Sequence, residues 1–145
     1  MKANTIIDFH CHIFPPEIIS KRESYQRKDR AFELLYQNPK AKLITVEELV
    51  TNMAKEGITK SVVFGFPWKD LEIYRLHNDY VIESIKKFPD KLIGFVCFLP
   101  SEDSNLVESE ILRCLDLGLS GIGEISWYLG DISEIVNHLT GVMEI

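Results

Sequence analysis

The sequence predicts an α/β fold with parallel strands. Strand-like and helix-like segments alternate along the chain in the order β-α, and this pair occurs four times. No linker or low-complexity tract interrupts this pattern, so we expect one domain over residues 1–145. The expected strands cover residues 5–12, 60–67, 92–100 and 119–128, and the expected helices cover residues 45–57, 76–90, 105–118 and 131–145.

The strand segments are rich in β-branched residues, whereas the helical segments carry apolar residues at helical spacing. In the first helix these residues are Val46, Leu49, Val50, Met53 and Ala54. Thr45 and Glu48 form a capping box at its start, and Gly57 is the expected C-terminal stop. These end signals support the helix prediction independently of the periodicity.

The later helices carry similar end signals. Asn105 is the expected cap of the third helix, and Gly118 is its expected stop. Asp131 is the expected cap of the fourth. His77 and His138 fall in helical segments and are expected to be partly exposed helix residues.

The connection between the first strand and the first helix is unusually long. Residues 13–44 hold seven Lys/Arg and four Asp/Glu, so this segment is basic in an otherwise acidic chain. Connections in parallel α/β folds normally have about 2–6 residues. We expect a functional loop here, with a helical turn near residues 29–37.

Composition excludes several classes of protein. Apolar residues make up 46% and charged residues 26%, as in a soluble globular protein. The net charge of −6 gives no general attraction for nucleic acid or anionic membranes. No apolar run approaches the roughly 18 residues of a membrane span. No secretory signal is visible, so a cytoplasmic location is expected. Cys11, Cys97 and Cys114 lack a CxxC pattern and are expected to be buried free thiols.

The end of the first strand carries two imidazoles. Side chains alternate across a strand, which divides this segment into a polar and an apolar face. One face carries Ile6, Asp8, His10 and His12, and the other carries Ile7, Phe9 and Cys11 and is expected to pack on helices. Parallel α/β folds build their sites at the carboxyl ends of strands. A divalent cation held by His10 and His12 would stabilise polar groups there, because neutral imidazole is a good metal ligand.

The stretch IIDFHCHIFPPEI resembles the opening of the amidohydrolase superfamily, in particular the amidohydrolase-related, metal-dependent TIM-barrel hydrolases and decarboxylases. This resemblance implies that His10 and His12 bind a catalytic metal at the top of a barrel. Asp8 has no ligand role in that pattern and is expected to support an imidazole. The implied fold is the parallel (β/α)4 half of a TIM-type barrel with a long loop after strand 1, and an open doubly wound sheet is the alternative.

The fourth strand adds a second resemblance. In SGIGEISWY, Glu124 is a carboxylate on an apolar strand, which is costly without a cation or hydrogen-bond donors. Superfamily members place a metal-bridging lysine or glutamate at this strand end, and TatD-type deoxyribonucleases carry a similar GEI. The resemblance therefore implies that Glu124 is the third ligand and a catalytic carboxylate. In relatives with a single metal the same carboxylate makes no metal contact, and this alternative stays open.

The resemblance covers only the N-terminal half of the family's fold, which has eight βα units. The family's further ligands are histidines on strands five and six and an aspartate on strand eight, and these have no counterpart here. We therefore expect a truncated or incomplete barrel that is inactive alone and that self-associates through exposed strand edges.

The expected activity of the parent enzyme is zinc-dependent hydrolysis of a small, anionic molecule bound near the basic loop. A metal-dependent non-oxidative decarboxylase, a TatD-like phosphodiesterase and a non-catalytic fragment are the alternatives. Trp68, Trp127 and Tyr128 follow strand ends, where they either line a substrate pocket or contribute to ordinary packing.

Overall fold

The computed structural model describes residues 5–99, 104–126, 128, 133, 136 and 139. Its strands are β1 (Ile7–His12), β2 (Lys60–Phe64), β3 (Leu92–Val96) and β4 (Gly121–Ile122). The helices between successive strands are α4 (Val46–Glu56), α5 (Leu71–Lys87) and α6 (Ser104–Asp116). The predicted alternation is confirmed over this part of the chain. The predicted helix over residues 131–145 lies for the most part outside the described residues, as do Trp127 and His138.

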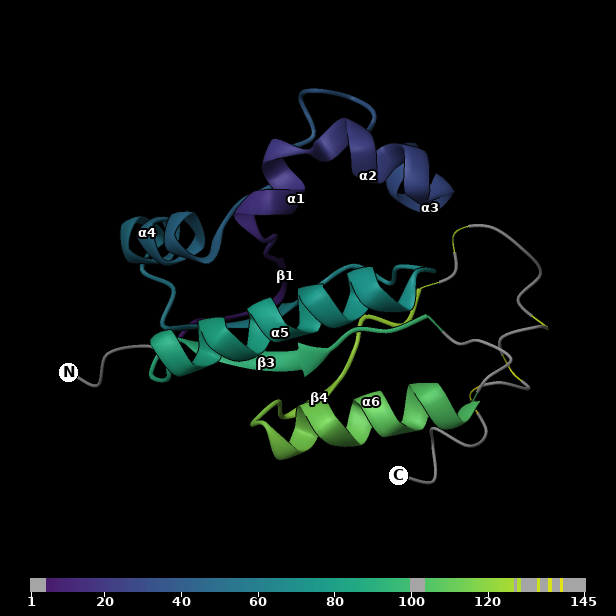
Figure 1. Cartoon of the computed structure of the whole chain (residues 1–145). Helices are drawn as coiled ribbons and strands as arrows, with labels where there is room; N and C mark the ends of the chain where they lie inside the picture. The colour runs from purple at the N-terminus through teal and green to yellow at the C-terminus, as the bar shows by residue number, and fades with distance from the viewer. Residues whose placement is uncertain are drawn as a thin grey trace.

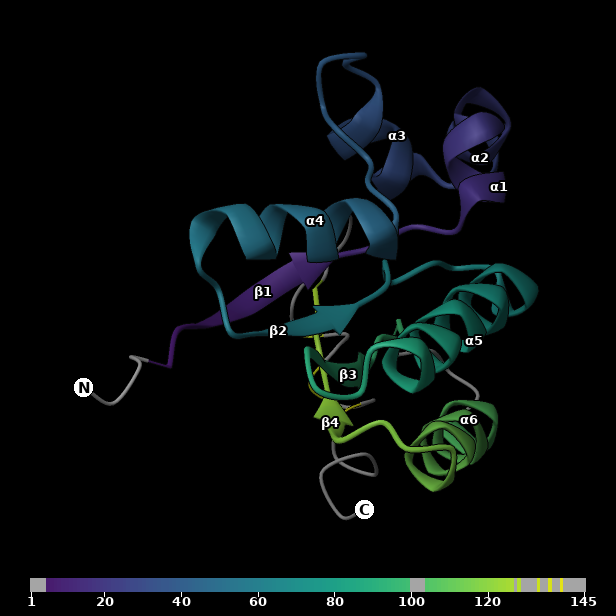
Figure 2. The same cartoon turned by 90° about the vertical axis from the view of Figure 1, so that its left-hand side faces the viewer.

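The strands form one parallel sheet in the order β1-β2-β3-β4, so every strand pairs with its neighbours in sequence. Figure 1 shows α5 lying along β3, with α6 beside β4. Figure 2 shows α4, α5 and α6 following one another around the same side of the strands. A doubly wound sheet would carry helices on both faces. The order and the single helical layer are those of the predicted (β/α)4 half of a TIM-type barrel.

The ends of α4 form as predicted. Thr45 and Glu48 make both hydrogen bonds of the capping box, and Gly57 ends the helix in the left-handed region with φ of +70°. The predicted start of α5 is wrong. This helix begins at Leu71 because the Asp70 side chain accepts hydrogen bonds from the backbone N–H groups of residues 72 and 73. Asn105 lies within α6 rather than capping it.

The earlier start of α5 explains a second correction. His77 falls in the middle of the helix and not at its first turn, on the face that packs against the strands. Its exposed fraction is 1%, so the expectation of a partly exposed histidine is wrong. Burial lowers the pKa of His77 to about 4, which keeps the imidazole neutral near pH 7.

The apolar face of β1 also departs from its prediction. Ile7 is 40% exposed and Phe9 is 66% exposed, so the prediction that these two residues pack on helices is wrong. The pairing of β1 with β2 shifts between Asp8 and Cys11, where two residues of β1, Phe9 and His10, lie opposite one residue of β2, Val62. Phe9 lies within this irregularity, where the regular alternation of the strand is interrupted. Cys11, beyond the shift, is buried as predicted, and all three cysteines are buried free thiols.

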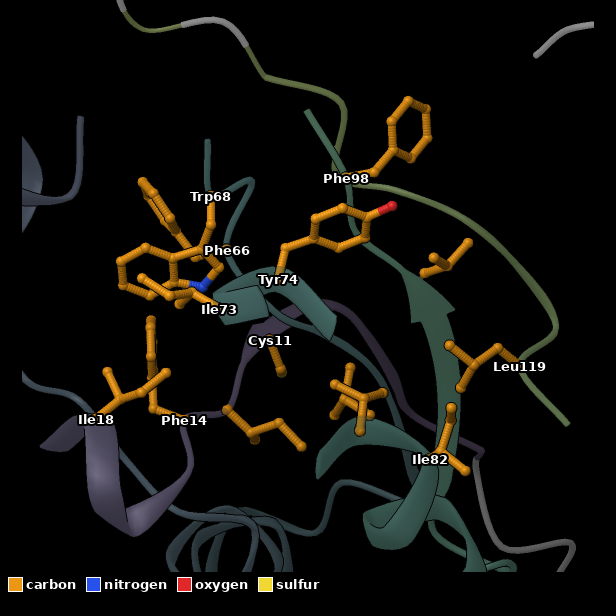
Figure 3. Close-up of a cluster of buried hydrophobic side chains, with 14 of the residues drawn as sticks. Cys11, Phe14, Ile18, Phe66, Trp68, Ile73, Tyr74, Ile82, Phe98 and Leu119 are labelled. Carbon is orange, nitrogen blue, oxygen red and sulfur yellow. The ribbon is translucent and has the colours of Figure 1, made fainter. Parts of the chain in front are cut away.

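The long connection after β1 contains α1 (Pro16–Ser20), α2 (Arg22–Lys28) and α3 (Arg30–Tyr36). The helical turn predicted near residues 29–37 is confirmed as α3, which the Asp29 side chain caps through two backbone N–H groups. An aromatic cluster joins this segment to the loop after β2. Figure 3 shows part of the cluster, in which Phe14 and Ile18 lie near Phe66 and Trp68.

No helix in the described part of the chain combines the length and the apolar character that crossing a membrane requires.

Candidate metal centre

The carboxyl ends of β1 and β4 bring three predicted residues together. His10 and His12 are in the last part of β1, and Glu124 follows β4 by two residues. The Nε2 atoms of the two histidines are 3.2 Å apart, and Glu124 Oε2 lies 2.9 Å from His10 Nε2 and 3.4 Å from His12 Nε2. Three donor atoms from two distant segments thus share one point at the predicted end of the sheet.

His12 is oriented by the backbone of the neighbouring strand. Its Nδ1 lies 2.8 Å from the carbonyl oxygen of Gly65, one residue beyond β2. A carbonyl only accepts, so Nδ1 carries the proton and Nε2 presents its lone pair to the other two residues. Burial lowers the pKa of His12 despite the opposing effects of the Gly65 hydrogen bond and the Glu124 carboxylate. The ring is therefore neutral near pH 7, in the form that binds a cation.

His10 is the open member of the group, with a side chain that is 63% exposed. The ring of Phe64 contacts both imidazoles edge to face, at centroid distances of 4.9 Å from His10 and 4.8 Å from His12. Asp8 Oδ1 accepts a hydrogen bond from the backbone N–H of His10, at 3.2 Å. The expected support by Asp8 thus reaches the backbone of His10 and not its imidazole.

Glu124 is oriented by two hydroxyl groups. Ser126 Oγ donates a hydrogen bond to Oε1 of the carboxylate, and Tyr128 Oη donates to the same oxygen at 2.6 Å. The second oxygen, Oε2, is the one that faces the histidines. Burial alone would raise the pKa of Glu124, but these hydroxyl hydrogen bonds and the two imidazoles outweigh it and lower the pKa. Glu124 is therefore an ionised carboxylate whose Oε2 faces the two histidines.

The sequence contained a signal for this arrangement. Residues 124, 126 and 128 alternate in an extended segment, so their side chains share a face. For Tyr128 the sequence predicts a role in a pocket or in packing, and it predicts no role for Ser126. The phenol ring of Tyr128 stacks on Phe66 at a centroid distance of 5.9 Å and an interplanar angle of 4°. Burial raises the pKa of Tyr128 to about 12, so the hydroxyl remains a donor.

Trp68 has a structural role and does not line an open pocket. It is almost fully buried in the aromatic cluster, and its Nε1 donates a hydrogen bond to His77 Nδ1 at 2.9 Å. The packing alternative is therefore the one that the structure supports for Trp68.

The basic segment uses part of its charge internally. Arg22 donates hydrogen bonds to the backbone carbonyls of Tyr36 and Asn38, at the end of α3. Lys21 pairs with Glu17, and Arg30 pairs with Glu33. These three cations stabilise the segment itself, and acceptance of an anionic substrate by the remaining ones stays a prediction.

The donor set fits a divalent ion. Two ligands on a tetrahedral ion about 2.0–2.1 Å away lie about 3.3 Å apart, and neighbouring ligands on an octahedral ion lie about 3.0 Å apart. The observed separations of 2.9–3.4 Å cover both values. Among the described residues, His10, His12 and Glu124 are the group of histidine, cysteine and carboxylate side chains whose donor atoms converge in this way.

No family model matches the sequence, and no curated protein is significantly similar to it. Solved structures do share its fold. The chain resembles 5-carboxyvanillate decarboxylase from Novosphingobium aromaticivorans, complexed with manganese and 4-hydroxy-3-methoxy-5-nitrobenzoic acid, with a TM-score of 0.72 and 21% identity. The match covers 98% of this chain and 49% of the decarboxylase.

Two further matches also cover most of this chain and less than half of the other protein. Dihydroxybenzoic acid decarboxylase from Polaromonas sp., with bound manganese and 2-nitroresorcinol, matches with a TM-score of 0.57 and 19% identity over 96% of this chain and 47% of that one. For 4-oxalomesaconate hydratase from Rhodopseudomonas palustris the TM-score is 0.54 and the identity 17%, over 81% of this chain and 41% of that one. The chain thus spans about half the length of the solved structures it matches, and the predicted half-barrel fold is confirmed.

Proposed function

We propose that His10, His12 and Glu124 bind one divalent metal ion and that residues 1–145 form a single domain, the N-terminal half of a metal-dependent enzyme of the amidohydrolase-related type. The convergence of three donor atoms from β1 and from the segment after β4 is the observation that carries this proposal. The preset tautomer of His12 and the ionised state of Glu124 support it, because metal ligands must be deprotonated.

The residues have distinct roles in this proposal. His12 and Glu124 are fixed by hydrogen bonds away from the shared point, so they supply oriented donors. His10 is exposed and leaves the outward side of the site open to a substrate. When bound, a divalent ion would polarise a carbonyl or carboxylate and lower the pKa of a bound water. We expect the metal to be zinc. Manganese is the ion in two of the matched structures.

Two reactions remain candidates for the complete enzyme. Hydrolysis of a small anionic molecule is the expectation from the sequence, and non-oxidative decarboxylation is favoured by the decarboxylases among the matched structures. Assays of substituted benzoates against amides and esters distinguish the two. A DNA-degradation assay tests the phosphodiesterase alternative. We expect negligible turnover by this chain alone, because the family's later ligands have no counterpart in these residues, and a second half-barrel or another copy would have to complete the site.

Elemental analysis tests the metal proposal. Purified protein incubated with zinc or manganese and then desalted should retain about one ion per chain. The double variant His10→Ala/His12→Ala should retain none, because two of its three donors are gone. Lys55→Ala, on the exposed side of α4, is the control and should retain as much metal as the unchanged protein. Equal metal in all three proteins would reject these ligands.

A further inference from the structure

Two consecutive residues of α5, His77 and Asn78, are both buried, with exposed fractions of 1% each. Neither belongs to the proposed ligand set. Successive side chains on a helix point about 100° apart, so neighbouring residues reach different parts of a sheet. Here one side chain reaches the segments after β1 and β2, and the other reaches the end of β3.

His77 joins the two segments that support His12. Its Nδ1 accepts hydrogen bonds from the Phe66 backbone N–H at 3.3 Å and from Trp68 Nε1 at 2.9 Å. Its Nε2 therefore carries the proton and donates to the carbonyl oxygen of Ile13 at 2.6 Å. Ile13 directly follows His12, and Phe66 directly follows the glycine whose carbonyl orients His12.

The His77 ring also packs directly on Gly65. A Cβ atom on Gly65 would lie 2.8 Å from Cγ of His77, closer than real side chains approach. The carbonyl of the same glycine accepts the hydrogen bond from His12 Nδ1. Through this contact and its hydrogen bonds, His77 fixes the backbone at Ile13 and at residues 65 and 66, the two segments that adjoin His12.

Asn78 acts on the other side of the site. Its Oδ1 accepts a hydrogen bond from the backbone N–H of Cys97, the residue that follows β3, at 3.2 Å. The Cys97 thiol in turn donates to the backbone carbonyl of Glu124 at 3.4 Å. Asn78 thus positions the end of β3 against the backbone of the carboxylate ligand.

Asn78 is itself held by a buried ion-pair network. Its Nδ2 donates to Glu110 Oε1 at 3.3 Å, and the Glu110 side chain is fully buried on α6. Arg113 and Arg75 pair with this carboxylate at 2.7 Å and 3.2 Å. A buried carboxylate needs such partners, so the network fixes Asn78 rigidly between the two helices.

From this geometry we infer that His77 and Asn78 are positioning residues that set the histidine ligands and the glutamate ligand relative to each other. The inference rests on the proposed metal site but concerns residues that touch neither the metal nor the substrate. Through His77, α5 orients His12, and through Asn78 it orients Glu124. A single helix therefore determines the distance between ligands that lie more than a hundred residues apart in sequence.

Cobalt binding and imidazole NMR test this role. His77→Leu and Asn78→Leu remove the hydrogen bonds at similar volume, and His77→Gln retains an acceptor and a donor. Ser84→Ala is the matched control, because Ser84 is buried on the same helix and its hydroxyl donates to the Tyr80 carbonyl, one turn earlier in α5. We measure the unfolding free energy, the Co²⁺ affinity and d–d spectrum, and the His12 tautomer in the metal-free protein by ¹⁵N NMR.

Both leucine variants should bind Co²⁺ at least about tenfold more weakly than Ser84→Ala, with an altered d–d spectrum. His77→Leu should also give a mixed His12 tautomer, and His77→Gln should restore a large part of the affinity. Affinities and spectra equal to those of Ser84→Ala would overturn the inference. If the unchanged protein binds no Co²⁺, the proposed function fails, and the His12 tautomer then decides this inference alone. If His77→Leu does not fold, His77→Gln and Asn78→Leu carry the test.

Discussion

On the histidine side of the candidate site the ligand His12 is oriented directly by a backbone carbonyl, whereas on the glutamate side the ligand Glu124 is oriented directly by side-chain hydroxyls. His12 is oriented by the carbonyl of Gly65, and the segments around it are fixed by a fully buried imidazole. Glu124 follows a strand of two residues and is oriented by the hydroxyls of Ser126 and Tyr128. A backbone donor or acceptor survives most substitutions, but a hydroxyl is removed by one.

Because of this difference, the two sides should be sensitive to different kinds of change. The histidine side depends on packing and on a neutral buried imidazole, so it is sensitive to added volume and to acid. The glutamate side depends on hydrogen bonds to a charged group, so it is sensitive to the loss of single polar atoms. Glu110, which anchors this side through Asn78, has a pKa lowered by its partners despite its burial.

Acid should have the largest effect, and it should act on the histidine side first. The unfolded chain binds a proton at His77 below about pH 6.5, whereas burial lowers the pKa of the folded state to about 4. Stability is therefore lost as the pH falls between these values, by on the order of 3 kcal/mol. His12, whose pKa is also lowered by burial, adds a loss in the same direction.

Urea unfolding from pH 7 to pH 4 measures this loss. His77→Gln has no titrating group at this position and should flatten the curve above pH 4.5. Glu110 contributes stability for a different reason, because its partners favour the charged carboxylate and so lower its pKa. That stability is lost only as the pH falls below about 4.5. Identical slopes above pH 4.5 in the two proteins would contradict the role of His77.

Added volume should have the next largest effect, and two glycines allow a matched comparison. In Gly65→Ala the new methyl group would meet the His77 ring at 2.8 Å, and that ring is fixed by three hydrogen bonds. We expect a loss of about 1–3 kcal/mol of unfolding free energy and weaker metal binding. In Gly121→Ala the methyl group would meet the half-buried Phe95 ring at 3.0 Å, and that ring can move aside.

Chemical denaturation of both variants gives the comparison directly. Gly121→Ala should lower the unfolding free energy less than Gly65→Ala does. The new methyl group would contact the Phe95 ring, which has no polar atom to hold it in place. A larger loss for Gly121→Ala would show that the glutamate side is the more tightly packed one.

Much of the fold and the core of the candidate site could be predicted from the sequence. The choice of Glu124 as the third ligand rests on the resemblance to the amidohydrolase superfamily. The β-α order, the capping box at Thr45 and the placement of His10 and His12 at a strand end depend on local patterns and on the rule that parallel strands place their sites at one edge. Such patterns depend on residue type and spacing, so a single sequence contains them.

The remaining features depend on information that spacing does not carry. The register shift at Phe9 and His10 adds a residue to one strand without changing its residue types. The Gly65 carbonyl has no sequence signature, because every residue has a carbonyl. The burial of His77 could have been predicted, because Asp70 is a good N-cap and would have placed the start of α5 correctly.

Loss of single polar atoms should have the smallest effect and should separate the two sides most sharply. Tyr128→Phe and Ser126→Ala each remove one hydrogen bond to the Glu124 carboxylate. Each should cost about 1 kcal/mol of unfolding free energy and weaken metal binding about tenfold, because Oε2 of the carboxylate is then no longer aimed at the histidines. Calorimetric titration with Zn²⁺ or Mn²⁺ measures the change.

Asp8→Asn is the control on the histidine side. Asp8 lies close to His10, but its Oδ1 accepts from the backbone N–H, which an asparagine oxygen also accepts. Stability should therefore change by no more than about 0.5 kcal/mol, with unchanged metal affinity. A loss of affinity as large as that of Tyr128→Phe would mean that the carboxylate of Asp8 acts on the His10 imidazole. The histidine side would then depend on side-chain charge as the glutamate side does, and the contrast between backbone and side-chain support would not hold.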